Sequence, residues 1–297
     1  GLTWSPKRPL TEATHGLPFY NCPRITLLRD GRLVVVVDKL FSDERSADPE
    51  SCHNVLYFST DEGFTWGEPV ETPVMGIVPD KLCELDSGRW LLAAHYRDVT
   101  FGYIIQRLWL SDDRGDSWQG PIIVGRKEGL NLCEVSILPV AGDVLVAFMR
   151  ENSGLGYDCY KAMSTDGGLS WGEPVAFPLP GCHRPVAGWI NDDLVLITHR
   201  FMQGGLGWTG WWTQNFFAGL TDRSSVLADS REKAHTRILP VDFDRSPASD
   251  TGYSGWVQFP NGDIYVVNYI VDDAPKGQIR GYHLDLNDFH FEIGGKR

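Results

Sequence analysis

Short apolar runs alternate with turn residues along the whole chain, and five pairs of runs flank a tight turn. In each pair, a run rich in β-branched or aromatic residues is followed by Gly, Asn or Asp and then by a second apolar run. This pattern predicts β-hairpins. The hairpins are expected at residues 23–38, 80–95, 134–150, 184–200 and 254–269. No helical period of comparable length competes with them.

A second repeat follows the first three hairpins. It reads STDEGFTW at 59–66, SDDRGDSW at 111–118 and STDGGLSW at 164–171, so its starts are 111 − 59 = 52 and 164 − 111 = 53 residues apart. Ser and Asp bond nearby backbone N–H groups and Gly supplies a positive φ, which makes the phrase a turn signal. The closing Trp is large enough to anchor that turn against a sheet. We therefore expect this repeat to stabilise the scaffold and not to carry chemistry.

A period of about 50 residues with about four strands is typical of a β-propeller blade. The sequence predicts an all-β protein, a β-propeller, as a single domain over residues 1–297. Five blade signals are complete, and GLTW at 1–4 resembles the tail of another repeat. Either an N-terminal blade is missing, or this segment closes the last blade. The Gly- and Trp-rich stretch 202–217 is expected to be a loop, which either packs its aromatic rings or stacks them on substrate.

Charge and cysteine content exclude several classes of protein. The net charge is 27 − 39 = −12 without a Lys/Arg block, which argues against a nucleic-acid partner. No apolar run is long enough to span a membrane, and no signal peptide is visible. Six cysteines without a C-x-x-C pair argue against zinc and predict buried thiols in place of disulfides. These cysteines and the lack of a visible signal peptide favour the cytoplasm. We expect no cofactor or metal, and the sequence does not predict an oligomeric state.

The repeated phrases resemble the Asp-boxes of sialidases. Over nearly its full length, the chain resembles the bacterial sialidase-like (BNR/Asp-box repeat) glycoside hydrolase superfamily. The resemblance implies a six-bladed propeller. It also implies that each box forms the turn between the outer two strands of a blade, away from the site.

The hairpins place candidate residues at one end of each blade. When they are aligned on their turn residues, position −9 falls at Cys22, Pro79, Cys133, Cys182 and Tyr253. Consecutive strands are antiparallel, so the start of each first strand and the end of each second strand lie at the same end. Charged residues of both signs gather at these positions. Solvated surface charge explains any one of them, whereas the whole set favours a site.

An anionic sugar needs arginines that hold its carboxylate through paired N–H donors. Sialidases attack with Tyr, activated by a neighbouring Glu, in place of the usual carboxylate. The resemblance implies that Tyr253 is the nucleophile, Glu134 its activating Glu and Asp48 the acid/base. Tyr253 is equally consistent with an aromatic that fills the channel, and Asp48 with a polar loop.

The resemblance further implies carboxylate binding by Arg24, Arg150 and Arg184. Glu134 and Arg150 are 16 residues apart across one hairpin, so a buried salt bridge is the alternative for them. The segment around Arg24 keeps only the Arg-Ile pair of the family motif. Four further residues are candidates for substrate binding: Arg97, Arg200, His183 and Asp80.

The leading hypothesis is therefore an exo-acting, retaining glycosidase of sialidase type, which releases a terminal sialic acid or related acidic sugar. Two alternatives stay open. One is a non-catalytic propeller that binds acidic glycans, and the other is an enzyme that acts on a uronic acid-containing polysaccharide.

Overall fold

The computed structural model of the chain describes residues 3–11, 16–41, 52–202 and 213–290. They fall into two compact units. The first unit contains Ser5–Asn152 and Tyr160–Pro174, and the second contains Gly1–Trp4, Ser153–Cys159 and Val175–Arg297. Both units are built from antiparallel β-sheets. The single domain predicted for residues 1–297 stays a prediction.

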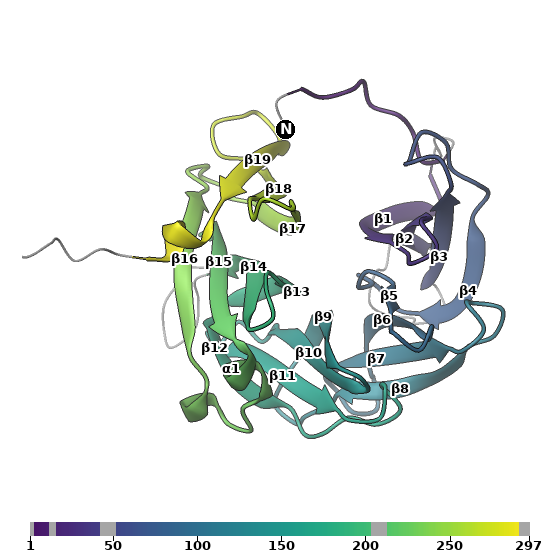
Figure 1. Ribbon diagram of the computed structural model, residues 1–297, viewed down its shortest axis with the longest axis horizontal. Coiled ribbons are helices and arrows are strands. Elements are labelled where there is room, and N and C mark those ends of the chain that lie inside the picture. The colour runs from purple at the N-terminus through teal and green to yellow at the C-terminus, as the bar shows by residue number, and fades with distance from the viewer. Residues whose placement is uncertain (1–2, 12–15, 42–51, 203–212, 291–297) are drawn as a thin grey trace, which may run out of the picture. The chain divides into compact units, whose positions relative to one another are not determined.

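Strands β1 to β10 and most of β11 lie in the first unit and run from purple to teal in Figure 1. The first sheet consists of β1 (Phe19–Leu27), β2 (Leu33–Leu40), β3 (Cys52–Ser59) and β4 (Val70–Met75), in that order. The next consists of β5 (Cys83–Glu84), β6 (Trp90–Arg97), β7 (Ile104–Ser111) and β8 (Gln119–Gly125). The third contains β9 (Leu132–Ala141), β10 (Val144–Glu151) and β11 (Asp158–Ser164).

The second unit contains β12 (Val175–Pro180) and two further sheets. One consists of β13 (Cys182–Trp189), β14 (Leu194–Met202), β15 (Gln214–Asp222) and β16 (Thr236–Phe243), and the other of β17 (Thr251–Gln258), β18 (Ile264–Ile270) and β19 (Gln278–Leu284). The helices are α1 (Arg223–Leu227), η2 (Arg231–Lys233) and η3 (Leu286–Phe289). Within the described residues, no helix has the length and apolarity needed to cross a bilayer.

All five predicted hairpins are confirmed. They are the antiparallel pairs β1–β2, β5–β6, β9–β10, β13–β14 and β17–β18. The prediction of a loop over 202–217 is wrong at both ends, because Met202 belongs to β14 and residues 214–217 to β15. The two strands pair without a register shift, and Met202 is the cross-strand partner of Gln214. Residues 203–212 of that stretch lie outside the described part of the chain. Thr3 and Trp4 do not form a strand.

The apolar runs are continuous because both faces of the central strands are covered. On β2, Val34 and Val36 pack in one core cluster with Leu56, Leu92 and Trp90. Val35 and Val37 point to the opposite face and pack with Val55 and Tyr57. A strand buried on both faces needs apolar residues at every position, so the sequence shows a run where a half-exposed strand would alternate.

The three repeated phrases form what we call the Ser-Asp turns, residues 59–66, 111–118 and 164–171. The first two connect β3 to β4 and β7 to β8, and the third follows β11. In the third, Ser164 Oγ donates to Asp166 Oδ1 (2.8 Å), and Gly168 N donates to Ser164 Oγ (2.9 Å). The Asp166 carboxylate also accepts from Ser170 N at 2.9 Å. The other two turns repeat this network.

The Trp of each Ser-Asp turn anchors it, as predicted. Trp171 packs against the core between the second and third sheets, and its Nε1 donates to Gly168 O at 3.2 Å. Gly168 has φ +92°, and a Cβ there would lie 3.1 Å from Leu108. The phrase is therefore a self-contained turn with one apolar anchor.

Candidate functional site

The first strand of every sheet, or the segment that leads into it, is irregular at the same place. Five residues there have φ between 43° and 55°, and we call them the first-strand bulges: Cys22, Val78, Glu134, Arg184 and Tyr253. In four of the five hairpins the pairing register shifts next to the bulge. A non-glycine residue adopts this conformation at a cost of about 1–3 kcal/mol, so the surrounding contacts must hold it. Three predicted site residues share this strained position.

The bulges correct the alignment made from the sequence. A fixed offset of nine residues selects Pro79, Cys133 and Cys182 in the middle three hairpins, where the structure has Val78, Glu134 and Arg184. The offset is wrong there because the number of residues between the bulge and the turn differs from one hairpin to the next. Glu134 and Arg184 stay candidates, now as equivalent positions of two sheets.

Glu134 and Arg150 meet at one end of the β9–β10 hairpin. Arg150 Nη1 lies 2.8 Å from Glu134 Oε1, and both side chains are largely buried. Arg150 Nη2 donates to Asn152 Oδ1 at 2.5 Å. The backbone N–H of Glu134 donates to His95 Nδ1 at 3.3 Å. The salt bridge that the sequence offered as the alternative for this pair is therefore present, and the catalytic roles of Glu134 and Arg150 stay a prediction.

Two buried aspartates hold the neighbouring irregular segments. Asp38 Oδ2 accepts from Val78 N at 2.9 Å, and Asp80 Oδ2 accepts from Ile137 N at 2.8 Å. Asp38 and Asp80 are 2% and 3% exposed. In each case a carboxylate of one sheet binds a backbone amide of the next, so the Asp80 carboxylate already has a structural contact.

The remaining candidates of the first unit are Arg24, Arg97 and Asp48. Arg24 is half-buried on β1, opposite Val36. Arg97 is exposed at the end of β6 and donates through Nη1 to Gly102 O at 3.1 Å. Asp48 lies outside the described residues.

A second group of candidates surrounds Tyr253 in the second unit. The Cζ atoms of Arg184 and Arg200 lie 5.4 and 5.2 Å from the centre of the Tyr253 ring. Arg184 is fully buried on β13, and Arg200 is 7% exposed on β14. Guanidinium groups at such distances interact favourably with an aromatic face. His183 is also buried and is the cross-strand partner of Arg200.

Two members of this group, Tyr269 and Asp250, are not among the site residues predicted from the sequence. Tyr269 stacks on Tyr253, with ring centres 6.0 Å apart and planes 19° apart. Its hydroxyl donates to Asp250 Oδ1 (2.7 Å) and accepts from Arg200 Nη2 (2.6 Å). Burial, the largest cause, and the Asp250 carboxylate raise the pKa of Tyr269, so this phenol stays protonated. Tyr269 lies near the end of its strand, as Arg150 and Arg200 do in theirs, and this position is the sequence feature that could have identified it as a site residue. No sequence feature identifies Asp250.

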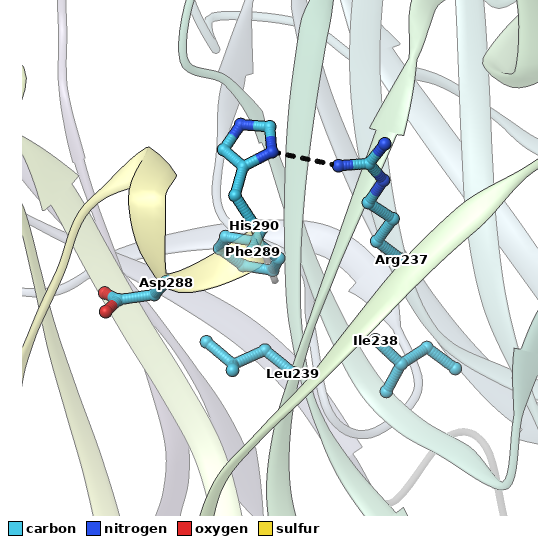
Figure 2. A pocket seen from close by; sticks show the side chains of 6 residues that line it. All are labelled: Arg237, Ile238, Leu239, Asp288, Phe289 and His290. Atoms are coloured by element: carbon cyan, nitrogen blue, oxygen red, sulfur yellow. Dashed lines mark hydrogen bonds between the residues drawn. The ribbon is translucent and has the colours of Figure 1, made fainter. Parts of the chain in front are cut away.

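A hollow of about 470 Å³ lies elsewhere in the second unit (Figure 2). It is lined by Arg237, Ile238 and Leu239 of β16 and by residues 288–290 at and just after η3. Arg237 Nη1 lies 3.1 Å from His290 Nδ1. The polar side chains that line this hollow are exposed. The hollow lies beside β16, the last strand of its sheet, whereas Arg184 lies on β13, the first strand of the same sheet. Among the described residues, no cluster of His, Cys, Asp or Glu is arranged to hold a metal ion.

Comparison with known proteins places the chain in a family. Residues 1–266 match the family described as BNR repeat-like domain, and the chain belongs to it. No curated protein matches. The fold is that of a sialidase-type β-propeller, and the five sheets correspond to the five blade signals in the sequence.

Three solved structures illustrate the likeness of fold. A protein of unknown function from Dyadobacter fermentans has a TM-score of 0.74 at 21% identity, over 95% of this chain and 80% of its own. The Hadza microbial sialidase Hz136 has a TM-score of 0.70 at 17% identity, over 97% of this chain and 57% of its own. The Penicillium chrysogenum α-L-arabinanase complexed with arabinobiose has a TM-score of 0.58 at 18% identity, over 88% of this chain and 80% of its own. The chain thus spans little more than half the length of the sialidase.

Proposed function

We propose that this protein is a retaining, exo-acting glycoside hydrolase that removes a terminal sialic acid or a related acidic sugar from a glycan. The observation that carries the proposal is the position of Tyr253, with the guanidinium groups of two buried arginines, Arg184 and Arg200, beside its ring. Positive charge around a phenol favours a substrate that carries a carboxylate. A neutral phenol attacks such a substrate without the repulsion that a carboxylate nucleophile would meet.

In this reaction the Tyr253 oxygen forms a bond to the anomeric carbon while the bond from that carbon to the leaving oxygen breaks. Glu134 takes the phenol proton, and Asp48 gives a proton to the leaving oxygen. Water then releases the sugar from Tyr253 with the same overall configuration. The likeness of fold to a sialidase supports this assignment of roles.

Arginines bind the carboxylate of the sugar in this proposal. Arg184 and Arg150 contact it, and Arg24 supplies a third guanidinium. Arg97, His183 and Asp80 contribute to the rest of the sugar site. Arg200 directs Nε and Nη2 to Thr251 O and Tyr269 Oη, so its role is to orient Tyr253.

The test compares hydrolysis of an aryl α-sialoside by the wild type, Tyr253→Phe and Tyr265→Phe. The control removes a hydroxyl from β18 of the same sheet. Tyr253→Phe should lose activity by roughly a thousandfold or more, the scale seen when an enzyme loses its nucleophile. Tyr265→Phe should keep it. Equal activity of wild type and Tyr253→Phe would overturn the proposal.

Two further outcomes point to the other hypotheses. Saturable binding of sialic acid by titration calorimetry, with no product after prolonged incubation, identifies a glycan-binding propeller. Product from uronides or arabinosides alone, in a mass-spectrometric screen of glycosides, identifies an enzyme with another substrate.

A further inference from the structure

Asp244, just after β16, is a buried carboxylate that accepts four backbone hydrogen bonds. Its Oδ1 accepts from the N–H groups of Ser246 and Asp272, both at 2.9 Å. Its Oδ2 accepts from Asp250 N at 2.9 Å and from Val271 N at 3.2 Å. The residue is 8% exposed. An ionised carboxylate offers about four acceptor positions, so the backbone contacts fill it.

These four amides belong to two segments that border the β17–β18 hairpin. Ser246 and Asp250 lie in the loop that leads into β17, and Val271 and Asp272 directly follow β18. Val271 N also donates to Asp250 O at 3.1 Å. Asp244 therefore fastens together the beginning of one strand and the end of the next.

The fastened end carries the groups around Tyr253. The Asp250 carboxylate accepts from the Tyr269 hydroxyl at 2.7 Å and lies 3.4 Å from Arg200 Nη2. Arg200 Nε donates to the carbonyl of Thr251, the residue after Asp250. Arg200 and Tyr269 both pack against the Tyr253 ring. A shift of residues 250–251 would therefore move both neighbours of that ring.

Gly252 packs closely against the Arg200 side chain, so the backbone near residue 251 has little room to move. Gly252 has φ +143°, and a Cβ there would lie 2.8 Å from Arg200 Nε. A distance below 3.0 Å between a Cβ and a backbone-anchored guanidinium requires that one of them moves. Arg200 thus occupies space that only glycine leaves free.

We propose that Asp244 is the positioning residue of the site: its carboxylate sets the backbone at 250 and 271, and through it the Asp250–Tyr269–Arg200 contacts that orient Tyr253. The consequence for turnover rests on the proposed function, whereas the consequence for the tyrosine rings does not. The four hydrogen bonds to the Asp244 carboxylate all come from backbone amides, so its influence on the rings passes through the backbone.

The test uses Asp244→Asn, which keeps the shape but replaces an acceptor oxygen with an NH₂ donor. Two of the four backbone amides then face another donor. The matched control is Asp166→Asn, the same change in a Ser-Asp turn, where the carboxylate also accepts from a backbone amide. Asp244→Asn should lower kcat on the aryl sialoside about tenfold to a hundredfold, as a small misplacement of a reacting group does, with little change in KM. Asp166→Asn should leave both constants unchanged.

A readout that needs no activity separates the two proposals. With 3-fluorotyrosine incorporated, the ¹⁹F signals of Tyr253 and Tyr269 are assigned from Tyr253→Phe and Tyr269→Phe. Both signals should move in Asp244→Asn and stay in place in Asp166→Asn, with Tyr57 of the first unit as a reference. If they move while no acidic glycoside is ever hydrolysed, the positioning role is supported and the proposed function fails.

Unmoved signals in a folded Asp244→Asn variant overturn the positioning role, whatever its activity. Moved signals with unchanged kcat overturn the link to catalysis. Should Asp244→Asn fail to fold, Asp244→Ser, whose hydroxyl oxygen still accepts hydrogen bonds, is judged by the same signals.

Discussion

The Ser-Asp turns and the first-strand bulges repeat in opposite ways. The turns repeat their residues, and each one satisfies its own polar groups by bonds that span two to four residues. The bulges repeat their backbone conformation, with φ between 43° and 55°, but the side chains differ in every sheet. Where residues repeat, the fold itself requires them. Where only the backbone repeats, the side chain is available for function.

The two regions also differ in how far their contacts reach along the chain. Glu134 contacts Arg150, 16 residues away, and Arg184 contacts Tyr253, 253 − 184 = 69 residues away. A substitution in a turn should therefore act on stability, and one at a bulge should act mainly on activity. This contrast leads to three predictions, which differ in the size of the expected effect.

The largest effect is expected for Glu134→Gln. It keeps the size of a bulge residue and removes the charge that pairs with Arg150. We expect kcat/KM on an aryl sialoside to fall by about 10²–10⁴-fold, the range for loss of a general acid or base. The measurement is steady-state kinetics on a variant whose fold is verified by circular dichroism.

Glu151→Gln is the matched control for this prediction. Glu151 is a buried carboxylate on the same hairpin that accepts from Asn131 N at 2.9 Å. Its variant should keep activity near that of the wild type. If the two variants lose activity equally, the bulge position has no special role.

A smaller effect, on stability alone, is expected for Asp166→Ala. The variant loses the bonds from Ser164 Oγ and Ser170 N, each a net contribution of about 1 kcal/mol. Urea denaturation should show a lower midpoint with an unchanged slope. Substrate preference should be that of the wild type. A variant as heat-stable as the wild type but with altered substrate preference would show that the turn acts on function and not on stability.

The smallest effect concerns pH. Hydrogen bonds, chiefly from the hydroxyls of Thr65, Ser117 and Ser170, lower the pKa of Asp61, Asp113 and Asp166 from 3.8 to about 2. Because these pKa values lie lower in the folded than in the unfolded chain, their stabilising contribution is present above about pH 4. It is lost as the pH falls towards about 2.

Thermal denaturation between pH 5 and pH 2 measures this contribution. The melting temperature of the wild type should decrease as the pH is lowered below about 4. The melting temperature of the triple variant Asp61→Asn, Asp113→Asn, Asp166→Asn should decrease less steeply over the same range. An identical pH profile in both proteins would show that the turns contribute nothing through these carboxylates.

Local patterns in the sequence were enough for the strands and turns. The run at residues 33–37 predicts the second strand of a hairpin, and β2 is that strand. STDGGLSW predicts an anchored turn because Ser164, Asp166 and Gly168 bond within eight residues. Hydrophobic periodicity and turn chemistry act over one hairpin, and a single sequence displays them directly.

Site positions were readable only where they lie across one hairpin. The pairing of Glu134 with Arg150 followed from hairpin geometry alone. The fixed offset failed in the three middle hairpins because the distance from the bulge to the turn varies, and no sequence pattern marks the bulge itself. Tyr269 was noticed only as a strand end, and its bonds to Arg200 and Asp250 were not predictable.

The sequence by itself thus determined the repeat, the hairpins and the turns, since the interactions that form them connect neighbours in the chain. Only the tertiary structure decided which polar groups meet: Asp244 with the amides of residues 271 and 272, and Arg200 with Tyr269. Those contacts join segments far apart in sequence, and their selection depends on how strands stack and where each register shifts. A carboxylate such as Asp244 looks like any loop aspartate until folding brings four amides to it.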